Sequence, residues 1–97
     1  MAKGFWVSTY REILDPDRLA AYAKLAGPAI ADAGGRFIVR GGTVTAHESG
    51  VPERTVVIEF DSYDAALAAH ETEGYQQALA ALEGGVVRDL RIVEGVD

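Results

Sequence analysis

The chain has 97 residues, of which 48% are hydrophobic and 25% charged, so we expect one packed domain over residues 1–97 rather than a disordered segment. Fifteen acidic residues against nine basic ones give a net charge of −6, and the basic residues form no stripe, which argues against a nucleic-acid partner. The absence of cysteine excludes disulfides, thiolate nucleophiles and sulfur-ligated metals.

The first part of the chain predicts a strand and a helix. Aromatic and β-branched residues over 5–12 favour the strand. Asp15 can cap the free N–H groups of a helix, and the proline after it fits the first helical position. Apolar residues then recur every three or four positions until Gly34-Gly35 ends the helix. Pro28 lies inside it and predicts a kink or a break near residues 24–27.

The middle of the chain predicts a long hairpin. Residues 36–40 form a short apolar strand. The pair Gly41-Gly42 predicts a β-bulge, after which the strand resumes over 43–47. The hairpin turns about Gly50, and the most apolar strand follows over residues 54–60.

The last part predicts a helical region and a final strand. Ser62 is a natural cap, and His70 lies on the apolar stripe of the helix that follows. The pattern stutters at residues 72–74 and then continues to Gly84-Gly85. The final strand lies within residues 86–94 and is centred on 89–93.

The order of these elements is β, α, β, β, α, β. Right-handed crossovers and a central hairpin then lead to an α+β fold of ferredoxin-like type. We therefore expect a four-stranded antiparallel sheet with two helices on one face.

Apolar and polar residues alternate too little along the strands for a sheet with one solvent-exposed face. Residues 37–39 and 56–58 are continuously apolar, and residues 90–93 are nearly so. Two helices can cover only one face, and a bare apolar face is rare on a soluble monomer. We therefore expect a homodimer through the sheet face. The alternative is a stable monomer with a modestly apolar sheet.

Six segments carry a resemblance to a known bacterial family: GGRF at 34–37, VRGG at 39–42, VIEF at 57–60, SYDAA at 62–66, EGYQ at 73–76 and IVEG at 92–95. In these segments the chain resembles domain-of-unknown-function family 1330, within the dimeric α+β barrel superfamily. The resemblance implies a ferredoxin-like fold and a dimeric α/β barrel formed through the sheets. It implies no reaction, although the wider superfamily includes cofactor-free monooxygenases, haem-degrading enzymes and isomerases of small ring compounds. His70-Glu71 departs from the bulky aromatic residues expected there, which would change the ligand if this segment lined the pocket.

Arg40 and Glu59 are the first candidates for chemistry. Folding about Gly50 places Arg40 beside Phe60, and a bulge at Gly41-Gly42 would bring Arg40 and Glu59 onto one face. Such a pair could bind an anionic ligand and move a proton. The alternative is a structural ion pair at the mouth of the barrel.

The histidines and aromatic residues supply the other candidates. His70 could act as a general base or a metal ligand, or be a half-buried helix residue with a backbone partner. His47 is expected to be exposed, and two histidines without a carboxylate spacing make no metal motif. Planar ligands could stack on a group of aromatic residues that otherwise serve as core: Trp6, Tyr10, Tyr22 and Tyr75. The predicted ligand-binding residues are Trp6, Tyr10, Arg40 and Tyr75.

These features predict a homodimer with a small-molecule pocket that acts as a cofactor-independent enzyme on a small organic acid or ring compound. The alternatives are a non-catalytic ligand-binding module and a structural dimerisation module. Neither a metal nor a cofactor is expected, because the two histidines form no metal motif and no phosphate-binding loop is present in the sequence. A Ser-His-Asp arrangement is also missing. No stretch approaches the ~20 apolar residues of a membrane span or resembles a signal peptide, which predicts a cytoplasmic protein without a membrane partner.

Overall fold

The computed structural model describes residues 2–97, and its elements follow the predicted order except that the second helical region is divided. The elements are β1 (Gly4–Ile13), α1 (Pro16–Asp32), β2 (Arg36–Arg40), β3 (Thr55–Phe60), α2 (Tyr63–His70), α3 (Glu73–Leu82) and β4 (Val86–Glu94).

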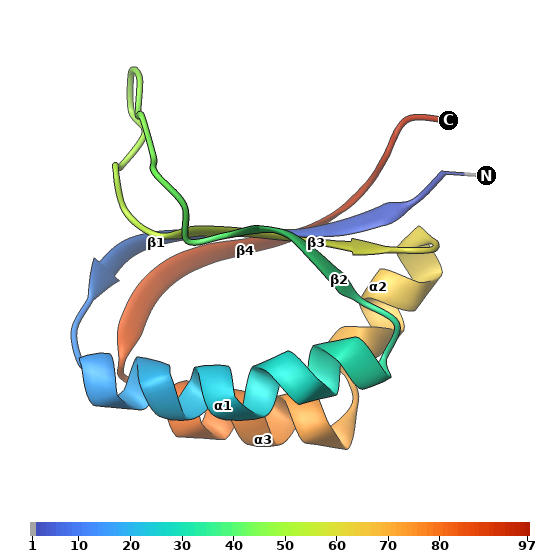
Figure 1. Cartoon of the computed structure of the whole chain (residues 1–97), viewed down its shortest axis with the longest axis horizontal. Coiled ribbons are helices and arrows are strands. Elements are labelled where there is room, and N and C mark those ends of the chain that lie inside the picture. Colours follow the sequence, from blue (N-terminus) through green and yellow to red (C-terminus); the bar gives the residue numbers. More distant parts are fainter. Residues whose placement is uncertain (1) are drawn as a thin grey trace.

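The four strands form one antiparallel sheet in the order β2-β3-β1-β4. Within residues 2–97, the three helices lie on one side of this sheet and the other face carries no helix (Figure 1). The predicted ferredoxin-like α+β fold is thereby confirmed.

The predicted capping residues start and end the helices. The Asp15 carboxylate accepts hydrogen bonds from the backbone N–H groups of Asp17 and Arg18, at 3.0 and 3.3 Å. Ser62 Oγ accepts a hydrogen bond from the backbone N–H of Ala65 at 3.0 Å. Gly34 and Gly84 follow α1 and α3 with φ angles of +90° and +77°, a conformation that glycine adopts without strain.

Of the kink or break predicted near residues 24–27, the break is wrong, because α1 continues through Pro28 as one helix of 17 residues. A proline at this position leaves the carbonyl of Lys24 without its helical partner. Both residues lie on the exposed side of the helix, where water can bond that carbonyl.

The stutter at residues 72–74 is a true interruption, so three helices are present where two were predicted. Helix α2 ends at His70, and Thr72 caps α3 by accepting a hydrogen bond from the backbone N–H of Tyr75 at 3.3 Å. The interruption lets the two segments follow different directions below the sheet (Figure 1).

The hairpin between β2 and β3 differs from the prediction. Arg40 pairs with Val56 rather than with Phe60, because the hairpin turns about Glu48, whose φ is +55°, and not about Gly50. Residues 43–47 form no strand. The register shift lies between Phe37 and Val39, so the bulged residue is Ile38 and the bulge predicted at Gly41-Gly42 is wrong.

The sheet separates a packed face from an open one. Trp6, Phe60 and Tyr75 are the largest fully buried side chains, and all three belong to the core between the sheet and the helices. Four apolar side chains of β2 and β4 are 42–53% exposed: Ile38, Val39, Val87 and Val93. Among residues 2–97, no helix combines the length and apolar character that a membrane crossing requires.

Gly35 provides a test of the packing where α1 meets the sheet. A Cβ at this position would lie 2.5 Å from Ile30 Cγ2 and 2.9 Å from the Phe60 ring. We expect Gly35→Ala to lower the free energy of unfolding by about 1–3 kcal/mol, because the added methyl group overpacks the core. A Cβ at Gly42 meets nothing within 4 Å, so Gly42→Ala is the matched control and should change stability by less than about 0.5 kcal/mol. Equal urea midpoints for the two variants would contradict the expected packing.

Candidate functional site

A pocket lies between the inner face of the sheet and helices α1 and α3. Its lining comes from all four strands and includes Trp6, Tyr10, Arg40, Tyr22, Tyr75 and Arg88. The cavity is about 30 Å³, which is room for one or two water molecules. An organic ligand therefore needs the side chains at the mouth to move aside.

The centre of the pocket is a cluster of hydroxyl groups around Arg88. Its Nη1 donates to Tyr22 Oη at 3.2 Å, to Tyr10 Oη at 3.3 Å and, at the longer distance of 3.5 Å, to Ser8 Oγ. Its Nη2 donates to Tyr75 Oη at 3.0 Å. The hydroxyls of Tyr22 and Tyr75 are hydrogen-bonded to each other at 2.7 Å. One guanidinium thus joins β4 to β1, α1 and α3.

Local sequence explains why these side chains meet. Ser8 and Tyr10 are two residues apart on β1 and therefore point to the same face. Arg88 is the partner of Tyr10 on β4, so it points to that face as well. Tyr22 lies on the buried stripe of α1, and Tyr75 lies on that of α3.

The cluster favours protonated tyrosine and charged arginine. Burial and the neighbouring Tyr75 raise the pKa of Tyr22 above its usual range, although Arg88 acts in the opposite direction. Burial opposes the charge of Arg88, but the oxygens of Tyr22 and Tyr75 outweigh this effect and raise the pKa of Arg88. At neutral pH the cluster therefore offers hydrogen-bond donors and a positive charge.

Aromatic rings form the apolar wall of the pocket. The Trp6 ring packs against Phe60 and Tyr75, with centroid distances of 5.3 and 4.7 Å. Trp6 Nε1 donates to the carbonyl of Ala66 at 2.8 Å, so its polar atom is already satisfied. Trp6 can therefore offer a ligand its ring face but not its N–H group.

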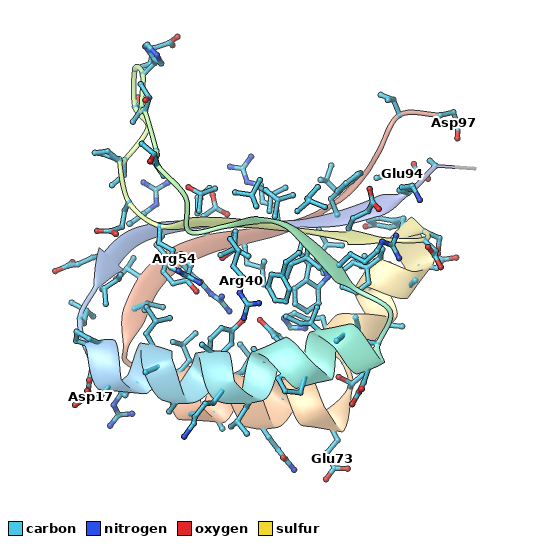
Figure 2. All side chains as sticks on the ribbon, in the orientation of Figure 1. Asp17, Arg40, Arg54, Glu73, Glu94 and Asp97 are labelled. Atoms are coloured by element: carbon cyan, nitrogen blue, oxygen red, sulfur yellow. The ribbon has the colours of Figure 1, made fainter. Side chains whose placement is uncertain are left out.

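Two further arginines stand at the mouth of the pocket. The side chains of Arg40 and Arg54 extend from the sheet into the space above α1 (Figure 2). The guanidinium of Arg40 lies over the Phe37 ring, 4.1 Å from its centroid. None of the described residues that line this pocket is acidic, so three guanidinium groups face it without a carboxylate.

Glu59 lies outside this pocket, and its predicted pairing with Arg40 is wrong. In the observed register Glu59 lies opposite Arg36, which binds its carboxylate with Nη2 at 3.0 Å and Nε at 3.1 Å. Val57 and Glu59 face away from the helices, whereas Arg40 faces toward them. Two differences are the physical reason. The turn at Glu48 moves the partner of Arg40 four residues along β3, to Val56, and the pairing has no bulge at Gly41-Gly42 that would turn Arg40 to the face of Glu59.

His70 also lies outside the pocket. Its ring packs against Trp6 and Tyr75 at centroid distances of 5.8 and 5.3 Å, and its Nδ1 is 3.1 Å from the carboxylate of Glu71. His70 and Glu71 border a separate shallow depression. His47 is exposed, as expected. Within residues 2–97, no three His, Asp or Glu side chains gather where they could hold a metal ion.

The sequence interpretation missed Arg88, Arg54 and Ser8. The signal for Arg88 was its spacing from Leu90 and Ile92, because residues two apart on a strand share a face. The aromatic candidates Trp6, Tyr10, Tyr22 and Tyr75 are brought together as one group.

The raised pKa of Tyr22 predicts a pH dependence of stability. The unfolded chain releases the Tyr22 proton near pH 10, before the folded protein does, so the stabilisation is complete below about pH 10 and is lost as the pH rises further. In the wild type, Tyr22 contributes up to about 1.4 kcal/mol per pH unit to the fall in the free energy of unfolding above pH 10. The Tyr22→Phe variant should lack this contribution. Urea unfolding at fixed protein concentration between pH 8 and about 11.5 measures this. Tyr63→Phe is the control, and equal declines in wild type and Tyr22→Phe would contradict the interpretation.

Comparison with solved structures finds the same fold in proteins of low sequence identity. A protein of unknown function from Rhodopseudomonas palustris is 15% identical with a TM-score of 0.77, over 99% of this chain and 84% of that one. SnoaB, a cofactor-independent oxygenase from Streptomyces nogalater, is 14% identical with a TM-score of 0.63, over 100% and 96%. A dimeric ferredoxin-like protein of unknown function from Thermobifida fusca is 16% identical with a TM-score of 0.55, over 98% and 92%. These likenesses establish the fold alone.

Sequence comparison identifies a family. None of the curated proteins compared with the chain matches it. The family model described as a domain of unknown function, DUF1330, matches residues 3–96. Since this match covers nearly the whole length and agrees with the fold, the chain belongs to the DUF1330 family.

Proposed function

We propose that this protein binds a small organic acid or an acidic ring compound in the pocket between the sheet and helices α1 and α3. The observation that carries the proposal is the guanidinium of Arg88, whose hydrogen-bond partners are all neutral hydroxyls. Arg88 is half-buried, and a charge withdrawn from water is normally paired with an opposite charge, because leaving it unpaired is costly. A carboxylate, phenolate or enolate oxygen would supply the missing negative charge.

The surroundings of Arg88 suit such an oxygen. Charge-assisted hydrogen bonds from a guanidinium are stronger than those between neutral groups. The protonated hydroxyl of Tyr22 or Tyr75 can add a second donor. The Trp6 ring and the apolar side chains of α1 limit water, which strengthens electrostatic attraction inside the pocket.

A cofactor-independent oxygenase is the second candidate, and it is an enzymatic form of the same site. Its support is the likeness in fold to SnoaB combined with a pocket that would stabilise an oxygen anion. In such a reaction a substrate that enters already deprotonated, as an enolate or phenolate, reduces O₂, and the guanidinium groups of the pocket hold that anion in place. Oxygen consumption in the presence of a bound ligand separates this candidate from binding alone.

The proposal also includes a homodimer through the open face of the sheet. The exposed side chains of Ile38, Val39, Val87 and Val93 support it, because they form an apolar surface that no helix covers. Ion pairs that flank this surface, Arg36 with Glu59 and Arg91 with Asp89, offer polar contacts at its margin. A cytoplasmic location stays a prediction from the sequence.

The binding proposal is tested with benzoate, which combines one carboxylate with one ring. Trp6 is the single tryptophan and lines the pocket, so its fluorescence reports occupancy. Arg88→Gln should weaken benzoate binding about 10- to 100-fold, since it removes a charged hydrogen-bond donor. Arg11→Gln removes an exposed arginine of β1 and should bind as the wild type does. Equal affinity of the two variants would reject the role of Arg88.

The dimer proposal is tested with two apolar residues of nearly equal exposure. Val93 on the open face is 45% exposed, and Leu25 on α1 is 44% exposed. Val93→Glu should raise the dimer dissociation constant by about 100-fold, because it buries an unpaired charge in each half of the interface. Leu25→Glu should leave it unchanged. Native mass spectrometry over a dilution series measures both, and a monomeric wild type would overturn the proposal.

A further inference from the structure

The guanidinium groups of Arg40 and Arg54 occupy the end of the pocket where the hairpin loop begins and ends. Arg40 is the last residue of β2, and Arg54 immediately precedes β3. Both point toward the helices (Figure 2). The Arg54 carbonyl accepts a hydrogen bond from the Tyr10 backbone N–H at 3.0 Å, and Tyr10 pairs with Arg88 on its other side. Arg54, Tyr10 and Arg88 therefore form one row across the sheet.

This row separates two positively charged positions. Adjacent strands lie about 4.8 Å apart, so the backbones of Arg54 and Arg88 are about 10 Å apart across β1. The hydroxyl cluster occupies only the Arg88 end. The other end holds the guanidinium groups of Arg40 and Arg54.

The two mouth arginines have no anionic partner within residues 2–97, unlike several arginines elsewhere in the protein. Arg18, Arg36 and Arg91 each form an ion pair with a carboxylate. No side-chain hydrogen bond or ion pair in the described part of the chain involves either mouth arginine, and Arg54 Nε is buried without a partner. The neighbouring carboxylate of Glu53 instead accepts a hydrogen bond from the backbone N–H of Arg54, at 3.0 Å.

A glycine allows the Arg54 guanidinium to approach the backbone closely. A Cβ on Gly41 would lie 2.5 Å from Arg54 Nη1, and the φ of Gly41 is +69°. A Cβ on Gly27 of α1 would lie at an ordinary contact distance of 3.5 Å from an Arg40 nitrogen, so α1 borders Arg40 without crowding it. Arg40 also rests on the Phe37 ring. These contacts set the positions of the two charges in the ligand-free protein, and both side chains must shift outward to admit a ligand.

We propose that Arg40 and Arg54 form a second anion subsite in this pocket, so that the ligand carries two acidic groups joined by a flat apolar body. This inference rests on the proposed function, since the first acidic group is the one held by Arg88. A carboxylate at the mouth would pair with the fork-shaped donor groups of Arg54 and Arg40. The ring between the two groups would lie along the wall formed by Trp6. The ligand class is an aromatic dicarboxylate or a ring compound of similar charge.

The test compares terephthalate, with carboxylates at opposite ends of a ring, with benzoate, which lacks the second one. Isothermal titration calorimetry of the intact wild-type protein should give terephthalate an affinity about 10- to 100-fold higher than benzoate. Arg54→Gln should remove this preference while lowering benzoate affinity far less than Arg88→Gln does. Arg40 is exposed, so the Arg40→Gln variant should fold, and it should show the same reduction of the preference. Arg88→Gln should weaken both probes, and Arg11→Gln should weaken neither.

Each other result has a definite meaning. Equal wild-type affinities, with benzoate binding still dependent on Arg88, overturn the second subsite and leave the proposed function standing. An equal loss for both probes in Arg54→Gln and Arg40→Gln also overturns the second subsite, because these residues then hold the first acidic group. Failure of both probes to bind the wild type rejects the inference together with the proposed function.

Discussion

The hydrogen bonds of Arg88 are the interaction on which the site depends. One guanidinium contacts the hydroxyls of Tyr10, Tyr22 and Tyr75, and these residues belong to β1, α1 and α3. The sheet and two helices are therefore joined at one positively charged point. Neutral dipoles solvate the charge but do not cancel it, so the pocket keeps a positive potential in a protein whose net charge is −6.

The two faces of the sheet carry different kinds of side chain. The inner face carries the aromatic wall and the three arginines of the pocket, whereas the outer face carries exposed apolar residues between ion pairs. Segment 41–54 connects the two faces. It extends beyond the outer face (Figure 1), yet it begins directly after Arg40 and ends at Arg54, whose side chains lie at the pocket mouth on the inner face.

Local chemistry made most of the fold predictable. Asp15, Ser62, Gly34 and Gly84 act within a few residues of themselves, and their effects on helix ends need no tertiary contact. The periodicity of apolar residues identified the strands and the buried stripes of the helices. It also selected the aromatic side chains of the pocket, because a residue's place in a period of two or 3.6 determines the face on which it lies.

Strand register and the partners of long polar side chains required the tertiary structure. The turn at Glu48 rather than Gly50 changed the partner of Arg40, and the sequence contains several glycines that could each have formed that turn. Arginine is compatible with either side of a sheet, since its charged end can reach solvent while its stem packs on apolar surface. Local sequence was thus sufficient for most of the elements, for the fold and for the family. Only the packing of α1 and α3 on the sheet decided that Arg88 meets three tyrosines, because those contacts join residues far apart in the chain.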